Sequence, residues 1–359
     1  MKLLKETLAS IVPLDDGVMA KVQVRLDSLT KPPGSLGRLE DIIRQYAGVT
    51  GEERPAIPRK CMVLAAADHG VARLGLSAYP IETTIHMTRN YLLSQGAGAN
   101  ALAKFCGADM VVVDMGVAGD LSDVPGLWHR KIAHGTADFT QGPAMSREQA
   151  IQAIETGIEI VVDRCGNGYR CFSIGEMGIG NTTSSAAIVA AFTGITPEQA
   201  TGRGTGISDS RLAIKIDAVR RGLAVNRPDR TDGLDILATV GGFEIGALAG
   251  VILGAAAHRC LVVIDGFNAS AAALIATSLA ADAREYLLAS HLSAEPAHTK
   301  MLEYLGLEAY IDMGLRLGEA TGASLAMNLL DAAIKMLDEM ATFAEAGVCR
   351  ESQEVLKSC

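Results

Sequence analysis

Short apolar segments that end in an acidic residue recur along the chain. Asp68, Asp114, Glu176 and Asp265 each close such a segment, with a glycine one or two positions later, and Glu319 follows an apolar stretch that breaks on glycine. In an open parallel sheet the carboxyl ends of the strands line the ligand crevice, and glycine lets the backbone approach what binds there. The pattern predicts an enzyme site rich in carboxylates and backbone amides. A lone glutamate between glycines is also typical of a solvated helix cap, so Glu319 gains meaning only with the others.

The order of the segments predicts an α/β fold. Strand-like and helix-like segments alternate from about Cys61 to about Glu319, as expected for a parallel sheet covered on both faces. Both chain ends have the apolar spacing of helices. We therefore predict a doubly wound catalytic domain over residues 59–323 and a small helical domain formed by both termini, residues 1–58 and 324–359.

The terminal helices have recognisable boundaries. Apolar residues recur at helical spacing over 19–29 and 36–46, and Pro32 and Pro33 separate these segments. Ser35 is the expected cap of the second helix. A third stripe runs over 326–344, and Gly347 is its expected stop.

Composition excludes several classes of protein. The chain is 49% hydrophobic and 20% charged with 38 glycines, as in α/β enzymes, and its net charge of −9 without a basic cluster disfavours nucleic acid as a partner. Seven cysteines without a C-x-x-C pair suggest reduced thiols. The N-terminus lacks the apolar stretch of a signal peptide, and the uncharged run 266–281 is too short to span a membrane. We expect a soluble cytoplasmic protein.

Two glycine-rich loops precede predicted helices. Gly175–Ser185 offers backbone N–H groups and hydroxyls at a helix start, which suits an anion; an ordinary tight turn capped by Asn181 or Thr182 explains it equally well. The second loop, Gly202–Gly206, leads into a helix that carries Lys215. Together they favour a phosphorylated ligand held mainly by loop amides and assisted by Lys215. Neither loop completes a Walker or dinucleotide-binding pattern, so an ordinary ATP or NAD site is disfavoured.

Metal and nucleophile patterns are weak. The seven histidines form neither an H-E-x-x-H motif nor an i, i+4 pair, and no G-x-S-x-G elbow is present. His69 beside Asp68 could bind a metal or act as a base, but a hydrogen-bonded structural histidine is the commoner arrangement. The polar segment Ser290–Glu295 is either crevice lining or a loop. We predict neither a metal nor a cofactor.

Taken in order, these segments resemble the nicotinate-nucleotide:dimethylbenzimidazole phosphoribosyltransferase family of cobalamin lower-ligand synthesis. The resemblance spans nearly the whole chain. The matching stretches are Lys31–Glu40, Ala67–Val71, Gly142–Arg147, Gly175–Thr183, Val240–Glu244, Asp265–Phe267, Ser290–Glu295 and Leu315–Glu319.

The resemblance implies a Rossmann-like catalytic domain, a dimer, and transfer of phosphoribosyl from nicotinate mononucleotide to an aromatic base. It implies that Glu319 is the general base and that Glu176 is a second acid near the ribose. The phosphate region then contains Met177, Gly178, Gly204, Thr205, Gly206 and Lys215. The nicotinate and base side contains Asp265, Phe267, Ser290, Ser293, Leu317 and Gly318.

One segment departs from the family pattern. Benzimidazole-using relatives carry a small hydroxyl residue before Pro80 and a glutamine seven residues after it, where this chain has Tyr79 and Met87. This is the base-binding region, so the acceptor could be dimethylbenzimidazole, another benzimidazole, a purine or a phenol. An equal alternative places both substitutions off the ligand face.

Two competing functions are weighed against transfer. Some phenol-using relatives pair non-identical subunits, so the chain could form a homodimer, or a heterodimer with a paralogue in which it is a non-catalytic partner. The acids and glycine loops argue against a silent chain. An NAD-dependent dehydrogenase is disfavoured by the missing dinucleotide fingerprint.

Overall fold

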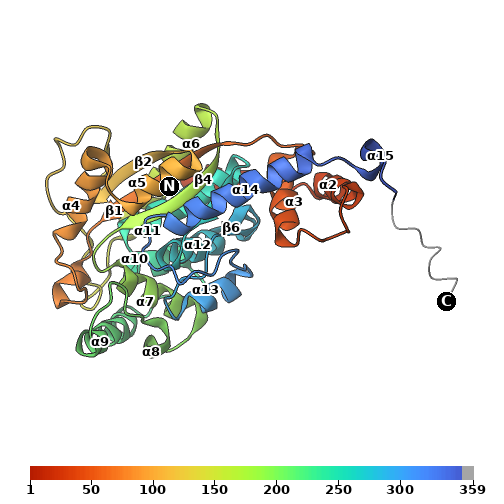
Figure 1. The fold of residues 1–359 in the computed structure, drawn as a ribbon. Helices are drawn as coiled ribbons and strands as arrows, with labels where there is room; N and C mark the ends of the chain where they lie inside the picture. The colour runs from red at the N-terminus through yellow and green to blue at the C-terminus, as the bar shows by residue number, and fades with distance from the viewer. Residues whose placement is uncertain (350–359) are drawn as a thin grey trace. The chain divides into compact units, whose positions relative to one another are not determined.

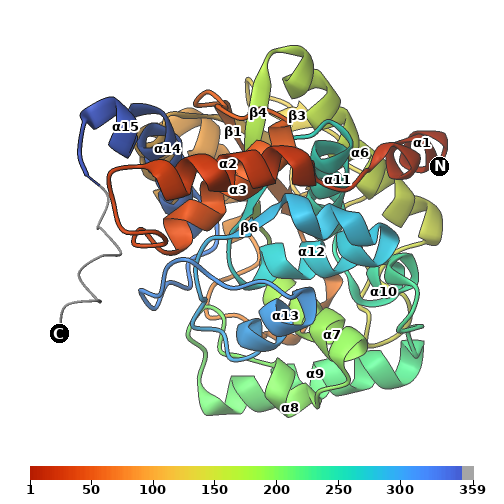
Figure 2. The same cartoon turned by 90° about the vertical axis from the view of Figure 1, so that its right-hand side faces the viewer.

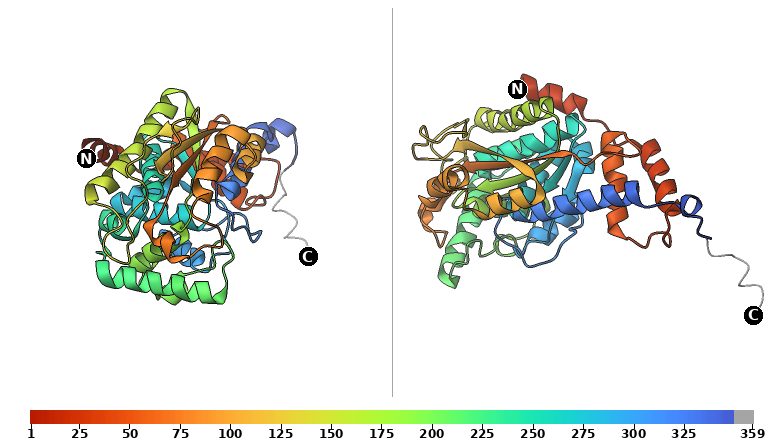
Figure 3. Two further views of the ribbon diagram at one scale, coloured as in Figure 1. Left: turned by 90° about the vertical axis from the view of Figure 1, so that its left-hand side faces the viewer. Right: turned by 45° about the horizontal axis from the view of Figure 1, so that its top comes forward.

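The computed structural model describes residues 1–349, which fall into two compact units. The larger unit comprises Met1–Pro13 and Pro58–Met327, and the smaller comprises Leu14–Ile57 with the residues from Asn328 onward. The first thirteen residues thus lie with the larger unit, whereas the sequence analysis grouped them with the terminal helices. The physical reason is helix α1 (Lys2–Ser10), which packs against α6 (Arg147–Gly166) and α11 (Phe243–Ala257) (Figure 3).

A six-stranded, all-parallel sheet forms the centre of the larger unit (Figure 1). Its strand order is β3-β2-β1-β4-β5-β6. Valine, leucine, alanine and isoleucine fill the central strands because both faces of the sheet are covered. The predicted α/β fold with a parallel sheet is confirmed. The strands are β1 (Arg59–Ala67), β2 (Ala108–Gly116), β3 (Trp128–His129), β4 (Tyr169–Met177), β5 (Leu261–Ile264) and β6 (Leu287–Ala289).

Helix α11 is the main support of the sheet. Nearly all of its residues are buried, and it packs along β1, β4 and β2 while α6 packs against it. Helix α12 lies beside α7 and α13 (Figure 2). The other helices of this unit are α4 (Thr83–Arg89), α5 (Gly98–Cys106), α7 (Asn181–Thr193), α8 (Pro197–Ala200), α9 (Asp209–Asn226), α10 (Gly233–Val240), α12 (Phe267–Leu279) and α13 (His298–Leu305), with short turns η1 (Gly70–Leu74), η2 (Asn90–Ser94) and η3 (Ala281–Tyr286).

The smaller unit contains α2 (Asp16–Ser28), α3 (Arg38–Thr50) and α15 (Phe343–Ala346). Helix α3 starts after Gly37 and not at Ser35, because residues 34–37 form turns closed by their own backbone hydrogen bonds. Glu40 is buried in an ion pair with Lys31, with 2.7 Å between Nζ and Oε1. The predicted C-terminal stripe is divided between α14 (Thr321–Glu339), which runs from one unit into the other, and α15, which ends at Gly347.

No helix within residues 1–349 is both long and apolar enough to cross a membrane. The cysteines of this part of the chain, Cys61, Cys106, Cys165, Cys171, Cys260 and Cys349, are free thiols. Within the same residues, no group of three or more histidine, cysteine, aspartate or glutamate side chains is arranged to hold a metal ion.

Candidate active site

A cavity of about 680 Å³ opens where β4 and β5 end, entirely within the larger unit. Most of the predicted site residues line it: Tyr79, Met87, Glu176, Met177, Gly178, Gly204, Thr205, Asp265, Phe267, Ser293, Leu317, Gly318 and Glu319. Gly206, Lys215 and Ser290 do not. Six segments that are far apart in the sequence therefore meet at one cavity.

Two of the five acids in the recurring pattern lie elsewhere. Asp68 Oδ2 accepts a hydrogen bond from Ala118 N at 2.7 Å, and Asp114 Oδ1 accepts one from Val117 N at 2.8 Å. Both carboxylates bind backbone amides of the segment that follows β2, so in this structure they stabilise that segment and do not line the cavity. The acids that line the cavity lie at the end of β4, directly after β5, in the loop after β6 and just before α14.

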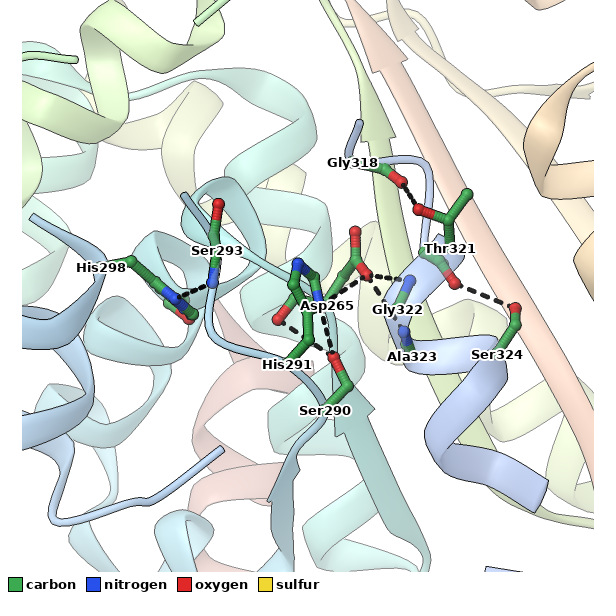
Figure 4. Close-up of polar contacts among 12 residues, drawn as sticks. Asp265, Ser290, His291, Ser293, His298, Gly318, Thr321, Gly322, Ala323 and Ser324 are labelled. Carbon is green, nitrogen blue, oxygen red and sulfur yellow. Dashed lines mark hydrogen bonds and ion pairs between the residues drawn. The ribbon is translucent and has the colours of Figure 1, made fainter. Parts of the chain in front are cut away.

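Glu319 precedes α14 in a left-handed turn and does not end a strand as the pattern predicted. Gly318, Glu319 and Ala320 have φ values of 83°, 58° and 57°. Such values are uncommon for residues with side chains and store local strain, which is often found at functional sites. Thr321 closes the turn, because its N and Oγ1 both donate to Gly318 O, at 3.1 and 2.8 Å (Figure 4).

Asp265 holds the helix that follows this turn. Its Oδ1 accepts hydrogen bonds from Gly322 N at 2.8 Å and Ala323 N at 3.0 Å, which are otherwise unpaired donors of the first turn of α14. Figure 4 shows the carboxylate at the end of β5 directed at these amides. Burial raises the pKa of Asp265 to about 7, although the hydrogen bonds from these N–H groups act in the opposite direction. Asp265 therefore joins the sheet to the segment that carries Glu319.

The Glu319 carboxylate is buried yet lines the cavity. Its Oε2 accepts a long hydrogen bond from Ala99 N at 3.4 Å. Burial raises the pKa of Glu319, while the Ala99 N–H and the Tyr91 hydroxyl favour the ionised form. A carboxylate with few donors around it, facing a cavity, is suited to accept a proton at neutral pH.

Glu176 is the second acid of the cavity and is the last residue but one of strand β4. A Cβ atom on Gly318 would come within 2.5 Å of Glu176 Oε1, and Gly318 has a φ of 83°, so glycine suits the close approach of the Glu319 turn to this carboxylate. Asn181 Nδ2 donates to Glu176 Oε2. Burial, followed by the charges of Glu244 and Asp265, raises the pKa of Glu176 to about 7, although Asn268 and Asn181 donate to it.

The glycine loop after β4 is not capped as an ordinary turn. Gly180 is the N-cap of α7 and no side chain caps the helix. Asn181 turns to Glu176, and Thr182 Oγ1 accepts a hydrogen bond from Lys215 Nζ at 2.8 Å. The side chains of both residues therefore bind Glu176 and Lys215 and do not cap the start of α7.

Lys215 lies beneath the second glycine loop. It is 1% exposed, and its Nζ also donates to Gly202 O at 3.1 Å. Burial lowers the pKa of Lys215 to about 8, and the nearby Glu295 acts in the opposite direction. In this structure the Lys215 ammonium joins the two glycine loops, and its expected assistance to a phosphate stays a prediction.

His69 is a buried structural partner and does not line the cavity. Its Nε2 lies 2.7 Å from Glu244 Oε1 and its Nδ1 lies 3.1 Å from Ser184 Oγ. Although burial lowers the pKa of His69, the Glu244 carboxylate outweighs this and raises it. Ser290 is also buried, with its hydroxyl 3.0 Å from His291 Nδ1.

Tyr79 and Met87 both line the cavity. Tyr79 is 58% exposed on the loop after η1, and Met87 is half-buried on α4. Sequence reasoning missed other lining residues, among them Thr182, Asn268, His291, Glu295 and Arg316. Glu295 and Arg316 lie in the stretches Ser290–Glu295 and Leu315–Glu319 that resemble the family. Their charged side chains were the feature of the sequence that could have marked them as site residues.

Comparisons with known proteins identify relatives that match nearly the whole chain. A family model described as phosphoribosyltransferase matches residues 11–348. The nicotinate-nucleotide–dimethylbenzimidazole phosphoribosyltransferase of Roseiflexus sp. is 55% identical over 348 residues, covering 97% of this chain and 98% of the relative. The enzyme of that name from Geobacter metallireducens is 52% identical over 348 residues, with the same coverage. The crystal structure of CobT from Thermus thermophilus superimposes with a TM-score of 0.90 at 45% identity, over 93% of this chain and 100% of that one.

Proposed function

The chain belongs to the nicotinate-nucleotide–dimethylbenzimidazole phosphoribosyltransferase family, and we propose that it transfers the phosphoribosyl group of nicotinate mononucleotide to an aromatic base. The products are nicotinate and an α-ribonucleotide 5′-phosphate for the lower ligand of cobamides. One observation carries the proposal: Glu319 and Glu176 line one cavity as buried carboxylates.

The chemistry needs one proton acceptor. A nitrogen of the incoming base attacks C1′ of the ribose as the bond from C1′ to the pyridinium nitrogen breaks, and the bonding electron pair returns to that nitrogen. Nicotinate therefore leaves with a neutral ring and needs no acid. The incoming azole must lose its N–H proton, and the Glu319 carboxylate accepts it.

Glu176 assists by its charge. Positive charge develops at C1′ as the donor bond stretches, and a fixed carboxylate in a water-poor site stabilises it. Asn181 and Asn268 orient this side chain and favour its ionised form. Asp265 contributes by holding the start of α14, where Glu319 lies.

The resemblance to the family also concerns the domains and the oligomeric state. We propose that the sheet belongs to the doubly wound, Rossmann-like class, in which the crevice lies at the carboxyl ends of the strands; the strand order β3-β2-β1-β4-β5-β6 supports this. We propose a catalytic domain of residues 59–323, a small helical domain from both termini and a dimer. Light scattering of the purified chain, alone and mixed with a paralogue, distinguishes a homodimer from a heterodimer.

The acceptor is the variable part of the proposal. Tyr79 and Met87 line the cavity. The family resemblance implies a small hydroxyl residue and glutamine at these positions in benzimidazole-using relatives, so the proposed acceptors include phenols beside 5,6-dimethylbenzimidazole. The alternative function is that of a partner subunit that binds nucleotide for a paralogue.

Incubating the purified chain alone with nicotinate mononucleotide and 5,6-dimethylbenzimidazole separates these functions. Nicotinate release that depends on the acceptor supports an active enzyme. Release that appears only after a paralogue is added supports the partner subunit.

A further inference from the structure

The second glycine loop offers fewer free amides than its sequence suggests. Gly204 N donates to Glu295 Oε1 at 2.8 Å, and Gly206 N donates to Arg203 O at 3.0 Å. Both donors are therefore satisfied within the chain. An anion at this loop therefore needs donors other than these two amides.

Lys215 does not supply positive charge at the cavity surface. It is almost fully buried, its Nζ donates to Thr182 and Gly202, and it is absent from the cavity lining. Its position beneath the loop lets it shape the two glycine segments. An anion in the cavity meets it only across Thr182 and the loop backbone.

Arg316 is different, because its guanidinium is exposed and lines the cavity. Its Nη1 lies 3.5 Å from Gly204 O, a long contact at the limit of a hydrogen bond. No ion pair of Arg316 occurs within residues 1–349. The cavity is lined by four carboxylates, on Glu176, Asp265, Glu295 and Glu319, and Arg316 is the single lysine or arginine among its lining residues.

We propose that Arg316 binds the 5′-phosphate of the donor nucleotide at the Gly204 loop. The proposal rests on the function proposed above. The donor carries two anionic groups, a phosphate and a carboxylate, and a cavity lined by four acids must offer at least one of them a cation. The guanidinium lies beside Gly204, with Thr182 and Thr205 also lining the cavity there. A planar fork of N–H groups pairs with two phosphate oxygens at once, and phosphate has the larger charge.

Equilibrium binding tests this assignment without requiring turnover. Calorimetry compares three ligands: nicotinate mononucleotide, nicotinate riboside, which lacks the phosphate, and nicotinamide mononucleotide, which keeps the phosphate but not the carboxylate. Arg316→Met should weaken both mononucleotides by about 10- to 100-fold, the range for a lost hydrogen bond to a charged group, and leave the riboside unchanged. Arg316→Lys should fall in between, because it keeps the charge and loses the fork.

The matched control is Arg220→Met, which removes the same charge from an exposed arginine of α9 that pairs with Glu198 and Asp217. It should bind all three ligands as the unmodified chain does. Equal losses for riboside and mononucleotide in Arg316→Met would overturn the proposal. A loss for nicotinate mononucleotide with none for nicotinamide mononucleotide would assign Arg316 to the carboxylate instead. Phosphate-dependent binding without turnover would contradict the enzymatic function alone.

Discussion

At the scale of single residues, the site depends on buried carboxylates that serve different purposes. Glu319 faces the cavity with weak hydrogen-bond donors, Glu176 is oriented by two asparagines, and Asp265 caps α14. The residue type was visible in the sequence for all three. Their different environments were not, because each depends on residues distant along the chain.

Glu319→Gln tests the general base. Glutamine keeps the size of the side chain but cannot accept the proton, so kcat should fall by about 10²–10⁴. Binding of nicotinate mononucleotide should change little, which calorimetry checks. Turnover at the level of the unmodified chain at neutral pH would remove Glu319 from the mechanism.

Donor binding should depend on pH. The pKa values of Glu176 and Asp265 are raised to about 7, so both carboxyls are partly protonated at neutral pH in the free protein. The cationic pyridinium favours their ionised forms, so binding releases protons and strengthens as pH rises from about 6 to 8, by up to about tenfold per pH unit for each group. Titration with nicotinate riboside avoids the phosphate as an additional titrating group.

Glu176→Gln is the control for this pH dependence. It removes one titrating carboxyl and keeps the amide partners, so the slope of affinity against pH should become shallower. Identical slopes in the variant and the unmodified chain would show that Glu176 does not titrate on donor binding.

At the scale of elements, the apolar runs correctly predicted the ends of β4 and β5. The strand-like stretch before Glu319 is not a strand in the structure. Strands β4 and β5 deliver Glu176 and Asp265 as the apolar runs predicted. The stretch before Glu319 forms no strand: Met313 and Leu317 are exposed, and the segment contacts residues 291–294 through an isolated bridge from Ile311 to His291 and a hydrogen bond from Ala294 N to Leu315 O. A short apolar stretch interrupted by Arg316 does not distinguish a strand from the rim of a cavity.

The glycine loops show a similar limit. Their position before α7 and α9 was predictable from the glycines and the helical spacing that follows. The hydrogen bonds from Gly204 N to Glu295 and from Lys215 Nζ to Thr182 join segments that are distant in the sequence. Local sequence pattern carries no information on such contacts.

Asp265 variants test the coupling between β5 and α14. Asp265→Ala leaves the Gly322 and Ala323 amides unpaired, which should cost about 1–2 kcal/mol of stability and lower kcat by displacing Glu319. Asp265→Asn keeps an acceptor oxygen and should retain most of both. Thermal unfolding and steady-state kinetics measure the two effects. Equal damage by alanine and asparagine would mean that the charge of Asp265 matters more than the cap.

At the scale of the whole molecule, family membership and the parallel sheet were readable from ordered motifs spanning nearly the whole chain. Helix α1 resembles the other N-terminal helices in its apolar pattern and differs in what it packs against, so the pattern alone does not show which unit it joins. Tyr79 and Met87 both line the cavity, so the proposal that they influence the choice of acceptor can be tested directly.

Competition between acceptors measures that influence. With limiting nicotinate mononucleotide, the chain should convert both 5,6-dimethylbenzimidazole and p-cresol, because Met87 offers no amide hydrogen bonds to favour the azole. Met87→Gln should raise the benzimidazole share of the product, resolved by mass. Exclusive benzimidazole product that Met87→Gln leaves unaltered would exclude these positions from acceptor choice.

The configuration of the product at C1′ tests the account most directly. Direct attack by the base, with Glu319 taking the proton, inverts C1′ of the β-configured donor. Proton NMR of the ribonucleotide formed from nicotinate mononucleotide and 5,6-dimethylbenzimidazole should therefore show the α-anomer alone, with one nicotinate released per product. A β-configured product would contradict the account, because it would require two displacements, with Glu176 as a covalent nucleophile in the first.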